Sequence, residues 1–191
     1  MITVCYQNTR LNKYVCSLIF LALSSLCFTG CGYSSAALLP KGMTSIYVEN
    51  FTNKINPAKD ITDRRANYSY RPGLEISITR GVLDAFIFDR HLELSNQKEA
   101  TLLLKGELVD FRQSPLSYGK NNDVEEYRFE IYVNLELYNN KTGELIWTEK
   151  HFMGYTNYSL SGTNSKTESQ ALNTAVKDLS QRIVERVVEN W

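Results

Sequence analysis

The sequence has few cysteines, and nearly all of them lie at one end. Four occur in 191 residues, and three of these precede Cys31, namely Cys5, Cys16 and Cys27. The three fall within an apolar N-terminal segment of the kind that is removed after secretion. A mature chain would then retain Cys31 alone, which excludes an internal disulfide.

Histidines and catalytic motifs are equally scarce. His91 and His151 are the only histidines, and neither belongs to an HExxH or HxH pattern that would supply zinc ligands. The sequence contains no GxSxG, Walker A or GxGxxG motif. We therefore predict that the protein is not an enzyme and that it uses no cofactor and no metal.

One enzymatic alternative stays open, because glycoside hydrolysis needs only two carboxylates at a suitable separation. Four glutamates are candidates for such a pair: Glu125, Glu126, Glu130 and Glu136. Solvated charges on one side of a strand are the simpler interpretation. A hydrolase would require two of the four in one pocket.

Neither sign of charge predominates. The chain has 21 basic and 21 acidic residues, and two of the basic ones, Arg10 and Lys13, precede Cys31, which leaves 19 against 21. A net charge so close to zero gives no reason to expect nucleic acid as a partner. With 43% hydrophobic and 22% charged residues, the length and composition predict one ordinary globular domain.

Residues 1–30 have the layout of a secretory signal peptide. A weakly basic start is followed by an apolar run from Tyr14 to Phe28, and small residues then precede Cys31. A helix of about 15 residues would cover about 23 Å, which is less than a hydrocarbon core of about 30 Å. The run therefore favours a removable leader over a permanent membrane span.

The stretch Phe28-Thr29-Gly30-Cys31 resembles a bacterial lipobox, in which the cysteine is acylated and becomes the new N-terminus. We expect a covalent lipid of the palmitate type on Cys31, and each buried CH₂ of such chains contributes about 0.8 kcal/mol to membrane association. By the usual sorting rule of lipoproteins, Gly32 after the cysteine favours the outer membrane. The expected location is the periplasmic side of that membrane.

The remaining chain divides into residues 31–45, an acylated N-terminus with a short tether, and residues 46–191, a single α/β domain. Alternating or apolar stretches predict strands at 46–50, 101–111, 126–138 and 145–155, and residues 92–94 could add another. The segment 126–138 has the clearest alternation of apolar and polar side chains. Residues 139–143 (NNKTG) predict a hairpin loop, whereas 53–71, 113–123 and 155–165 are expected to be longer loops.

Two helices are expected. Pro72 fits the first turn of a helix, and one apolar face follows it at Leu74, Ile78, Val82, Ala85 and Phe86. Thr167 and Gln170 match a capping box at the start of a second helix, which has its own apolar stripe. These elements predict an α+β two-layer sandwich: a mixed, mostly antiparallel sheet of four to five strands with two helices packed on one face.

Two loops carry candidate binding residues. The first, 54–71, combines two tyrosines with Lys54, Arg64, Arg65 and other basic residues, which would suit an anionic lipid or saccharide, although a solvated loop is the alternative. The second, 113–123, carries Pro115, Tyr118 and Lys120 at the tip of a strand pair. Long loops at such tips are often functional, but a plain turn is equally open.

Several segments in order along the chain resemble the LptE family of outer-membrane lipoproteins. They are Gly30-Cys31-Gly32-Tyr33, Ile46-Tyr47-Val48-Glu49-Asn50-Phe51, Leu104-Lys105-Gly106, Ser114-Pro115-Leu116-Ser117-Tyr118, Glu126-Tyr127-Arg128 and Thr142-Gly143-Glu144-Leu145-Ile146-Trp147. No single one of these motifs is specific, so the likeness rests on the ordered set.

The resemblance implies an α/β domain that plugs an LptD-like outer-membrane β-barrel, helps to assemble it, and contacts lipopolysaccharide during export. Basic loop residues are the expected contacts, because lysine and arginine meet phosphate as charged donors. We therefore select a set of candidate contacts for lipopolysaccharide or the barrel: Lys54, Arg64, Arg65, Pro115, Tyr118, Lys120 and Arg128.

The alternative is an outer-membrane lipoprotein that binds or activates a periplasmic cell-wall enzyme. Proteins of that kind commonly reach inward on a long tether. Here about 12 residues, 34–45, form the tether, and they span at most about 40 Å. The short tether favours a function at the membrane itself.

Overall fold

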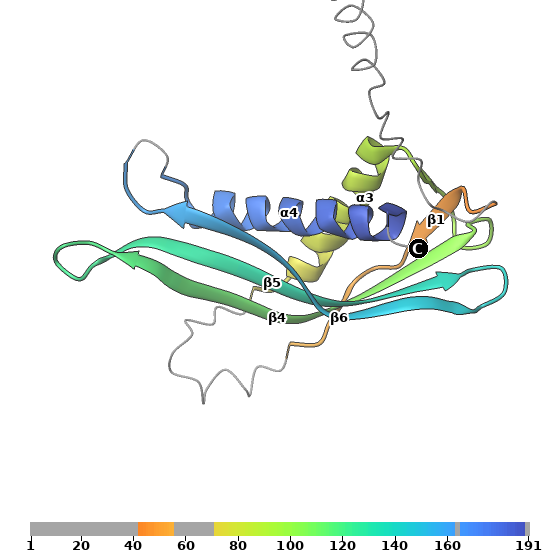
Figure 1. Ribbon diagram of the computed structural model, residues 1–191, viewed down its shortest axis with the longest axis horizontal. Coiled ribbons are helices and arrows are strands. Elements are labelled where there is room, and N and C mark those ends of the chain that lie inside the picture. Colours follow the sequence, from red (N-terminus) through yellow and green to blue (C-terminus); the bar gives the residue numbers. More distant parts are fainter. Residues whose placement is uncertain (1–41, 56–70, 163–164, 190–191) are drawn as a thin grey trace, which may run out of the picture. The chain divides into compact units, whose positions relative to one another are not determined.

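A mixed sheet of six strands forms one layer of the fold, and two helices form the other (Figure 1). The computed structural model describes residues 42–55, 71–162 and 165–189, which belong to the unit Ala37–Trp191. The strands are β1 (Ser45–Val48), β2 (Thr52–Asn53), β3 (Glu93–Leu94), β4 (Leu102–Tyr118), β5 (Val124–Asn139) and β6 (Leu145–Ser159), and the helices are α3 (Leu74–Asp89) and α4 (Glu168–Glu189).

The strands are arranged in the order β3-β1-β4-β5-β6, and β2 lies beside β4. The three long strands form an antiparallel meander, whereas the short strands β1, β2 and β3 pair in parallel. This is the predicted mixed, mostly antiparallel sheet. Both helices lie on the same side of it (Figure 1), so the predicted two-layer α+β sandwich is confirmed.

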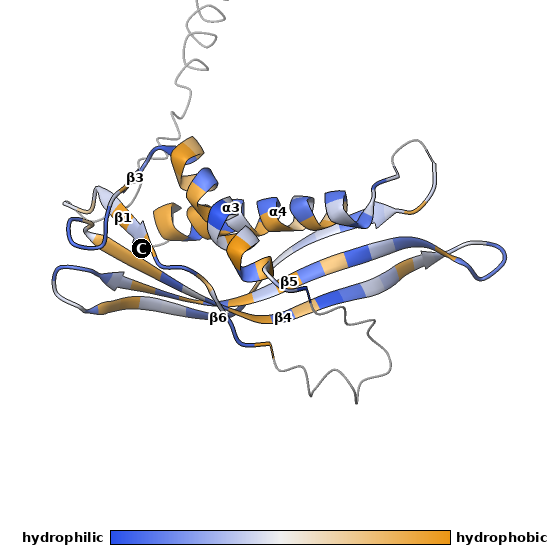
Figure 2. Ribbon diagram, turned by 180° about the vertical axis from the view of Figure 1, so that it is seen from behind, coloured by the Kyte–Doolittle hydropathy of each residue, from blue (hydrophilic) through white to orange (hydrophobic). Residues whose placement is uncertain are grey.

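The core lies between the two layers. Every second side chain of β5 from Phe129 to Leu137 is fully buried, and bands of opposite hydropathy follow the strands in Figure 2. The helices supply the other half of the core through one face each. Fully buried examples are Ile78 and Val82 of α3, and Ala175, Leu179, Ile183 and Val187 of α4. The apolar stripes predicted from the sequence are therefore the faces that pack.

The helix starts agree with the sequence in one case and differ in the other. In the predicted capping box of α4, the Thr167 N–H donates to Gln170 Oε1 at 2.9 Å and the Gln170 N–H donates to Thr167 Oγ1 at 3.3 Å. The first turn of α3, in contrast, does not contain Pro72. That helix begins at Leu74, because Gly73 before it has a left-handed backbone (φ 84°) that no helix continues.

Two strands are longer than predicted. The strand expected to end at residue 111 continues as β4 to Tyr118, and β6 continues past residue 155 to Ser159. β4 stays paired with β5 despite irregularities in register, including one between Pro115 and Ser117. A proline fits a strand at such a position, because a bulge does not require its missing N–H. The predicted loop 113–123 is therefore only a short turn after Tyr118.

Helix α4 lies along the outer edge of β6 and contacts it. The Tyr155 N–H donates to Asp178 Oδ2 at 3.0 Å, and the same oxygen accepts from Arg182 Nε at 2.8 Å. Nearer the C-terminus, Arg186 Nε donates to Glu149 Oε1 at 2.9 Å. These contacts hold the helix along the strand. In the part of the chain that the structure describes, no helix is long and apolar enough to cross a membrane.

Candidate functional site: the open face of the sheet

One face of the sheet is covered by neither α3 nor α4, and we call it the open face (Figure 1). It carries the polar side chains of the alternating pattern in β5, as the sequence predicted. These side chains are polar or aromatic and only partly buried: Arg128, Glu130, Tyr132, Asn134, Glu136 and Tyr138. The open face is therefore a polar surface that regular structure holds in place.

A hollow of about 460 Å³ lies on the open face, where the starts of β4 and β6 meet the second half of β5. Its lining combines three lysines and three glutamates with amide and hydroxyl groups: Lys54, Lys105, Lys150, Glu49, Glu107, Glu136, Asn50, Asn134, Thr52 and Thr148. We call it the lysine hollow. Its three cations and three carboxylates balance, and together with the neutral groups they offer both donors and acceptors to a polar ligand.

Strand register brings these residues together. Lys105 of β4 lies opposite Glu136 of β5, which in turn lies opposite Thr148 of β6. In addition, Lys105 Nζ lies 3.8 Å from Glu49 Oε2, which links the segment after β1 to the hollow. Residues distant in sequence thus share one site.

Phe51 anchors the segment that supplies Asn50, Thr52 and Lys54. Its side chain is buried and lies where a side chain of Gly106 would be, since a Cβ there would come within 2.1 Å of the ring. Its N–H donates to Thr79 Oγ1 of α3 at 3.0 Å. The core therefore fixes the segment, and the polar neighbours of Phe51 line the hollow.

Three cation–aromatic pairs extend along the open face. Lys105 Nζ lies 5.3 Å from the ring centroid of Tyr138, and the guanidinium of Arg112 lies 5.1 Å from that of Tyr132. Arg128 lies 5.0 Å from the ring of Tyr155, which Arg182 approaches to 5.4 Å. Each pair joins a positive charge to a flat aromatic surface.

The carboxylate of Glu136 changes the pKa of one of these tyrosines, Tyr138. The Tyr138 hydroxyl donates to Glu136 Oε2 at 2.7 Å. This hydrogen bond, followed by desolvation and the negative charge of Glu136, raises the pKa of Tyr138 above its ordinary value of 10.0. The folded protein therefore holds the Tyr138 proton more tightly than an isolated tyrosine would.

The hydrolase alternative finds little support in this geometry. Of the four candidate glutamates, only Glu136 lines the lysine hollow. Its companions there are Glu49 and Glu107, and Glu49 lies beside the ammonium group of Lys105. Among the described residues, no group of three or more His, Cys, Asp or Glu could hold a metal ion.

The structure places the predicted site residues apart from one another. Lys54 lines the lysine hollow, whereas Arg128 lies farther along β5, where its Nε donates to Asn157 Oδ1 at 2.8 Å. Pro115 and Tyr118 are exposed residues of β4, and Lys120 lies in the turn that follows. Cys31, Arg64 and Arg65 lie outside the described residues.

The sequence prediction missed Lys105, Lys150 and Asn134 as members of one site. Their signal was present in part, because Lys105 and Asn134 stand at polar positions of alternating strands. Their grouping depends on which residues face each other across strands, and that register is not evident from a single sequence.

The family model described as LptE: Lipopolysaccharide-assembly matches residues 43–187, which includes all the described strands and nearly all of α4. The chain belongs to the LptE family. As an LptE-family protein it is a lipoprotein of lipopolysaccharide assembly and outer-membrane biogenesis, and the family is not one of enzymes.

Solved structures with a similar fold share little sequence with this LptE-family chain. A minor lipoprotein from Acinetobacter baumannii is 19% identical, with 78% of this chain and 92% of that chain covered and a TM-score of 0.47. A hypothetical protein from Chlamydia trachomatis is 13% identical, with 75% and 95% covered and a TM-score of 0.49. The PelC dodecamer from Paraburkholderia phytofirmans is 14% identical, with 80% and 92% covered and a TM-score of 0.45.

These similarities are too low to carry a functional argument. A search of curated protein sequences found no match. The family match therefore stands as the basis of the assignment.

Proposed function

We propose that this LptE-family lipoprotein is anchored to the outer membrane through acylated Cys31 and plugs an LptD-like β-barrel. In this role it assists assembly of the barrel and contacts lipopolysaccharide during export. The family match over residues 43–187 is the observation that carries the proposal. It also favours this role over activation of a periplasmic cell-wall enzyme.

The open face supplies the physical support. A polar surface suits the interior of a barrel, because barrel lumens are polar. The lysines of the hollow would meet the phosphates of lipopolysaccharide, and the tyrosines beside Lys105 and Arg112 would lie against sugar rings. Arg128 extends this surface toward the turn between β4 and β5. The candidate contacts still include the exposed residues Pro115, Tyr118 and Lys120. They also include Arg64 and Arg65 of the predicted loop 54–71.

The partner can be tested by affinity purification from detergent-solubilised outer membrane. We expect a large β-barrel protein to copurify with the full chain, and Cys31→Ala to leave the protein unacylated. Recovery of the wild-type lipoprotein without a barrel partner would contradict the plug role. Depletion provides a second test, because loss of surface lipopolysaccharide is expected, whereas a defect confined to the cell wall would favour the alternative.

The lysine hollow can be tested separately. Replacing Lys54, Lys105 and Lys150 with glutamine is expected to weaken lipopolysaccharide binding about tenfold or more, since three charge contacts of about 0.5–1 kcal/mol each are lost. Binding to immobilised lipopolysaccharide is the measurement.

The matched control replaces three exposed lysines that do not line the hollow, Lys98, Lys141 and Lys166. It removes the same net charge and should bind nearly as well as the wild type. Equal losses in the two triple variants would show that binding follows total charge and not the hollow.

A further inference from the structure

Helix α3 has apolar side chains on a surface that no described residue covers. Phe88 is 85% exposed and Ile87 is 62% exposed, and the C-terminal end of the helix is hydrophobic in Figure 2. A single exposed apolar residue is ordinary, but two adjacent ones of this size at a helix end mark a surface that is covered in use.

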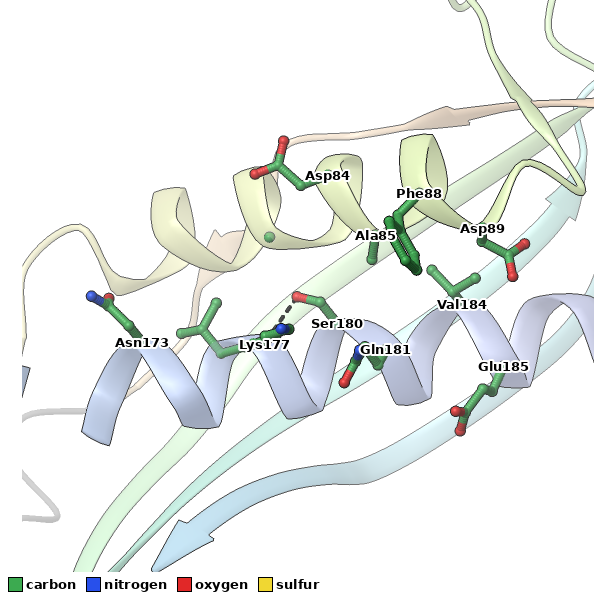
Figure 3. A pocket seen from close by; sticks show the side chains of 12 residues that line it. Asp84, Ala85, Phe88, Asp89, Asn173, Lys177, Ser180, Gln181, Val184 and Glu185 are labelled. Atoms are coloured by element: carbon green, nitrogen blue, oxygen red, sulfur yellow. Dashed lines mark hydrogen bonds between the residues drawn. The ribbon is translucent and has the colours of Figure 1, made fainter. Parts of the chain in front are cut away.

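A groove of about 630 Å³ runs between α3 and α4 beside Phe88 (Figure 3). Apolar side chains from both helices line it, among them Ala85, Val176 and Val184. Its polar group Ser180 is already satisfied, because Ser180 Oγ donates to the Val176 carbonyl oxygen at 2.8 Å. The groove is therefore suited to an apolar occupant of a few residues.

The charges around the groove select among occupants. Three carboxylates lie along it, Asp84, Asp89 and Glu185, against the single ammonium group of Lys177. This excess of negative charge repels phosphates of lipopolysaccharide and anionic lipids, and it attracts a cationic segment. The fitting occupant is thus an apolar peptide that carries a positive charge.

We propose that residues 37–41 of this chain, Ala-Leu-Leu-Pro-Lys, occupy the groove. Leu38 and Leu39 pack against the apolar lining and Phe88, and Lys41 lies beside the carboxylates. Leu39 precedes Pro40, which biases it toward the extended backbone that a groove accommodates. The segment thus combines the apolar side chains and the positive charge that the groove favours.

The connection to β1 gives the segment the necessary reach. The Glu93 N–H donates to the Thr44 carbonyl oxygen at 3.0 Å, and Glu93 follows α3 by only four residues. The chain therefore enters the domain beside the C-terminal end of α3. Leu39 precedes Thr44 by five positions, with four residues between them, which allows about 17 Å of travel. The docking does not depend on the proposed role in lipopolysaccharide export.

Disulfide trapping in the full chain tests the proposal. Leu39→Cys combined with Ala85→Cys is expected to form an intramolecular disulfide in most molecules under mild oxidation, read as a mobility shift in non-reducing gels. The matched control pairs Leu39→Cys with Lys120→Cys in the β4–β5 turn, where less than about a tenth should cross-link. Ala85→Cys alone controls for reaction with Cys31.

Three outcomes would overturn the proposal: no intramolecular disulfide with Ala85→Cys, equal cross-linking in the control pair, or cross-links between copies or to a barrel protein. Thermal unfolding gives an independent measure. Leu38→Asp with Leu39→Asp should lower Tm by about 5 °C, whereas Ser34→Asp with Ser35→Asp should not. Phe88→Ser should lower Tm in the wild type but add little to the leucine variant, because both remove one contact. An unchanged Tm in both the Leu38→Asp, Leu39→Asp variant and the Phe88→Ser variant would also refute the docking.

Discussion

Tyr158 on β6 is a buried tyrosine whose environment has consequences at high pH. Its ring stacks on Phe129 with centroids 5.0 Å apart, and its hydroxyl accepts from Gln113 Nε2 at 2.6 Å. Burial is the largest cause that raises the pKa of Tyr158 above 10.0, although the hydrogen bond from Gln113 acts in the opposite direction. The folded protein therefore holds this proton more tightly than the unfolded chain.

The sign of the pH dependence follows from that difference. Tyr158 contributes its full stability below about pH 10, and this contribution is lost as the pH rises through the folded-state pKa. Tyr158→Phe should therefore reduce the fall in unfolding free energy that begins above about pH 10. It should also lower stability at neutral pH by about 1 kcal/mol, because the bond to Gln113 is lost.

Urea unfolding at a series of pH values measures both effects. Tyr118→Phe, at an exposed site, controls for the loss of one tyrosine. A variant Tyr158→Phe whose alkaline slope equals that of the wild type would show that another group dominates this range.

Among the elements, β6 and α4 approach each other unusually closely at Gly154. A Cβ added there would lie 2.5 Å from the Cα of Leu179 and 2.7 Å from its backbone nitrogen. Gly154→Ala should therefore force strand and helix apart and destabilise the protein by about 1–3 kcal/mol. Urea denaturation measures the change.

Gly119→Ala is the matched control for that substitution. The three atoms nearest to its added Cβ would all belong to the flexible side chain of Glu125, so the expected change is below about 0.5 kcal/mol. If Gly154→Ala changed the stability as little as Gly119→Ala, the contact with Leu179 would relax without cost.

The sequence predicted elements best where one local rule decides them. The alternation of β5 and the apolar stripe of α4 each follow from a single periodicity, and the Thr167–Gln170 cap depends on two residues in one turn. The end of β4 depends instead on pairing with β5, which carries the strand past Pro115. A local reading stops at the proline, because the stabilising partner is elsewhere in the chain.

The candidate site shows the same limit. Lys54 could be selected as a basic residue in a polar segment, but its neighbours in the hollow, Lys105 and Lys150, come from two other segments. Their meeting depends on the register of three strands and on Phe51 filling the space beside Gly106. Neither condition is visible in composition or spacing.

At the scale of the whole molecule, one core joins both described helices and every described strand of the unit Ala37–Trp191 except the two-residue β2. A chain that begins at Ala37 should therefore unfold in one cooperative transition. Its dependence on urea should be about 1–3 kcal/mol per molar. Far-ultraviolet circular dichroism and tryptophan fluorescence should give the same midpoint. Two separated midpoints would contradict the prediction of a single domain.

The contact between Asp178 and the Tyr155 N–H also governs how the protein meets other β-structures. The exposed margin of a sheet is a template on which a foreign strand can add, and soluble proteins must block it. Here a carboxylate already occupies a backbone donor that an incoming strand would need, and Arg182 holds that carboxylate in place. Along this stretch the edge of β6 is therefore closed to strand addition, which suits the enclosure by a barrel that we propose.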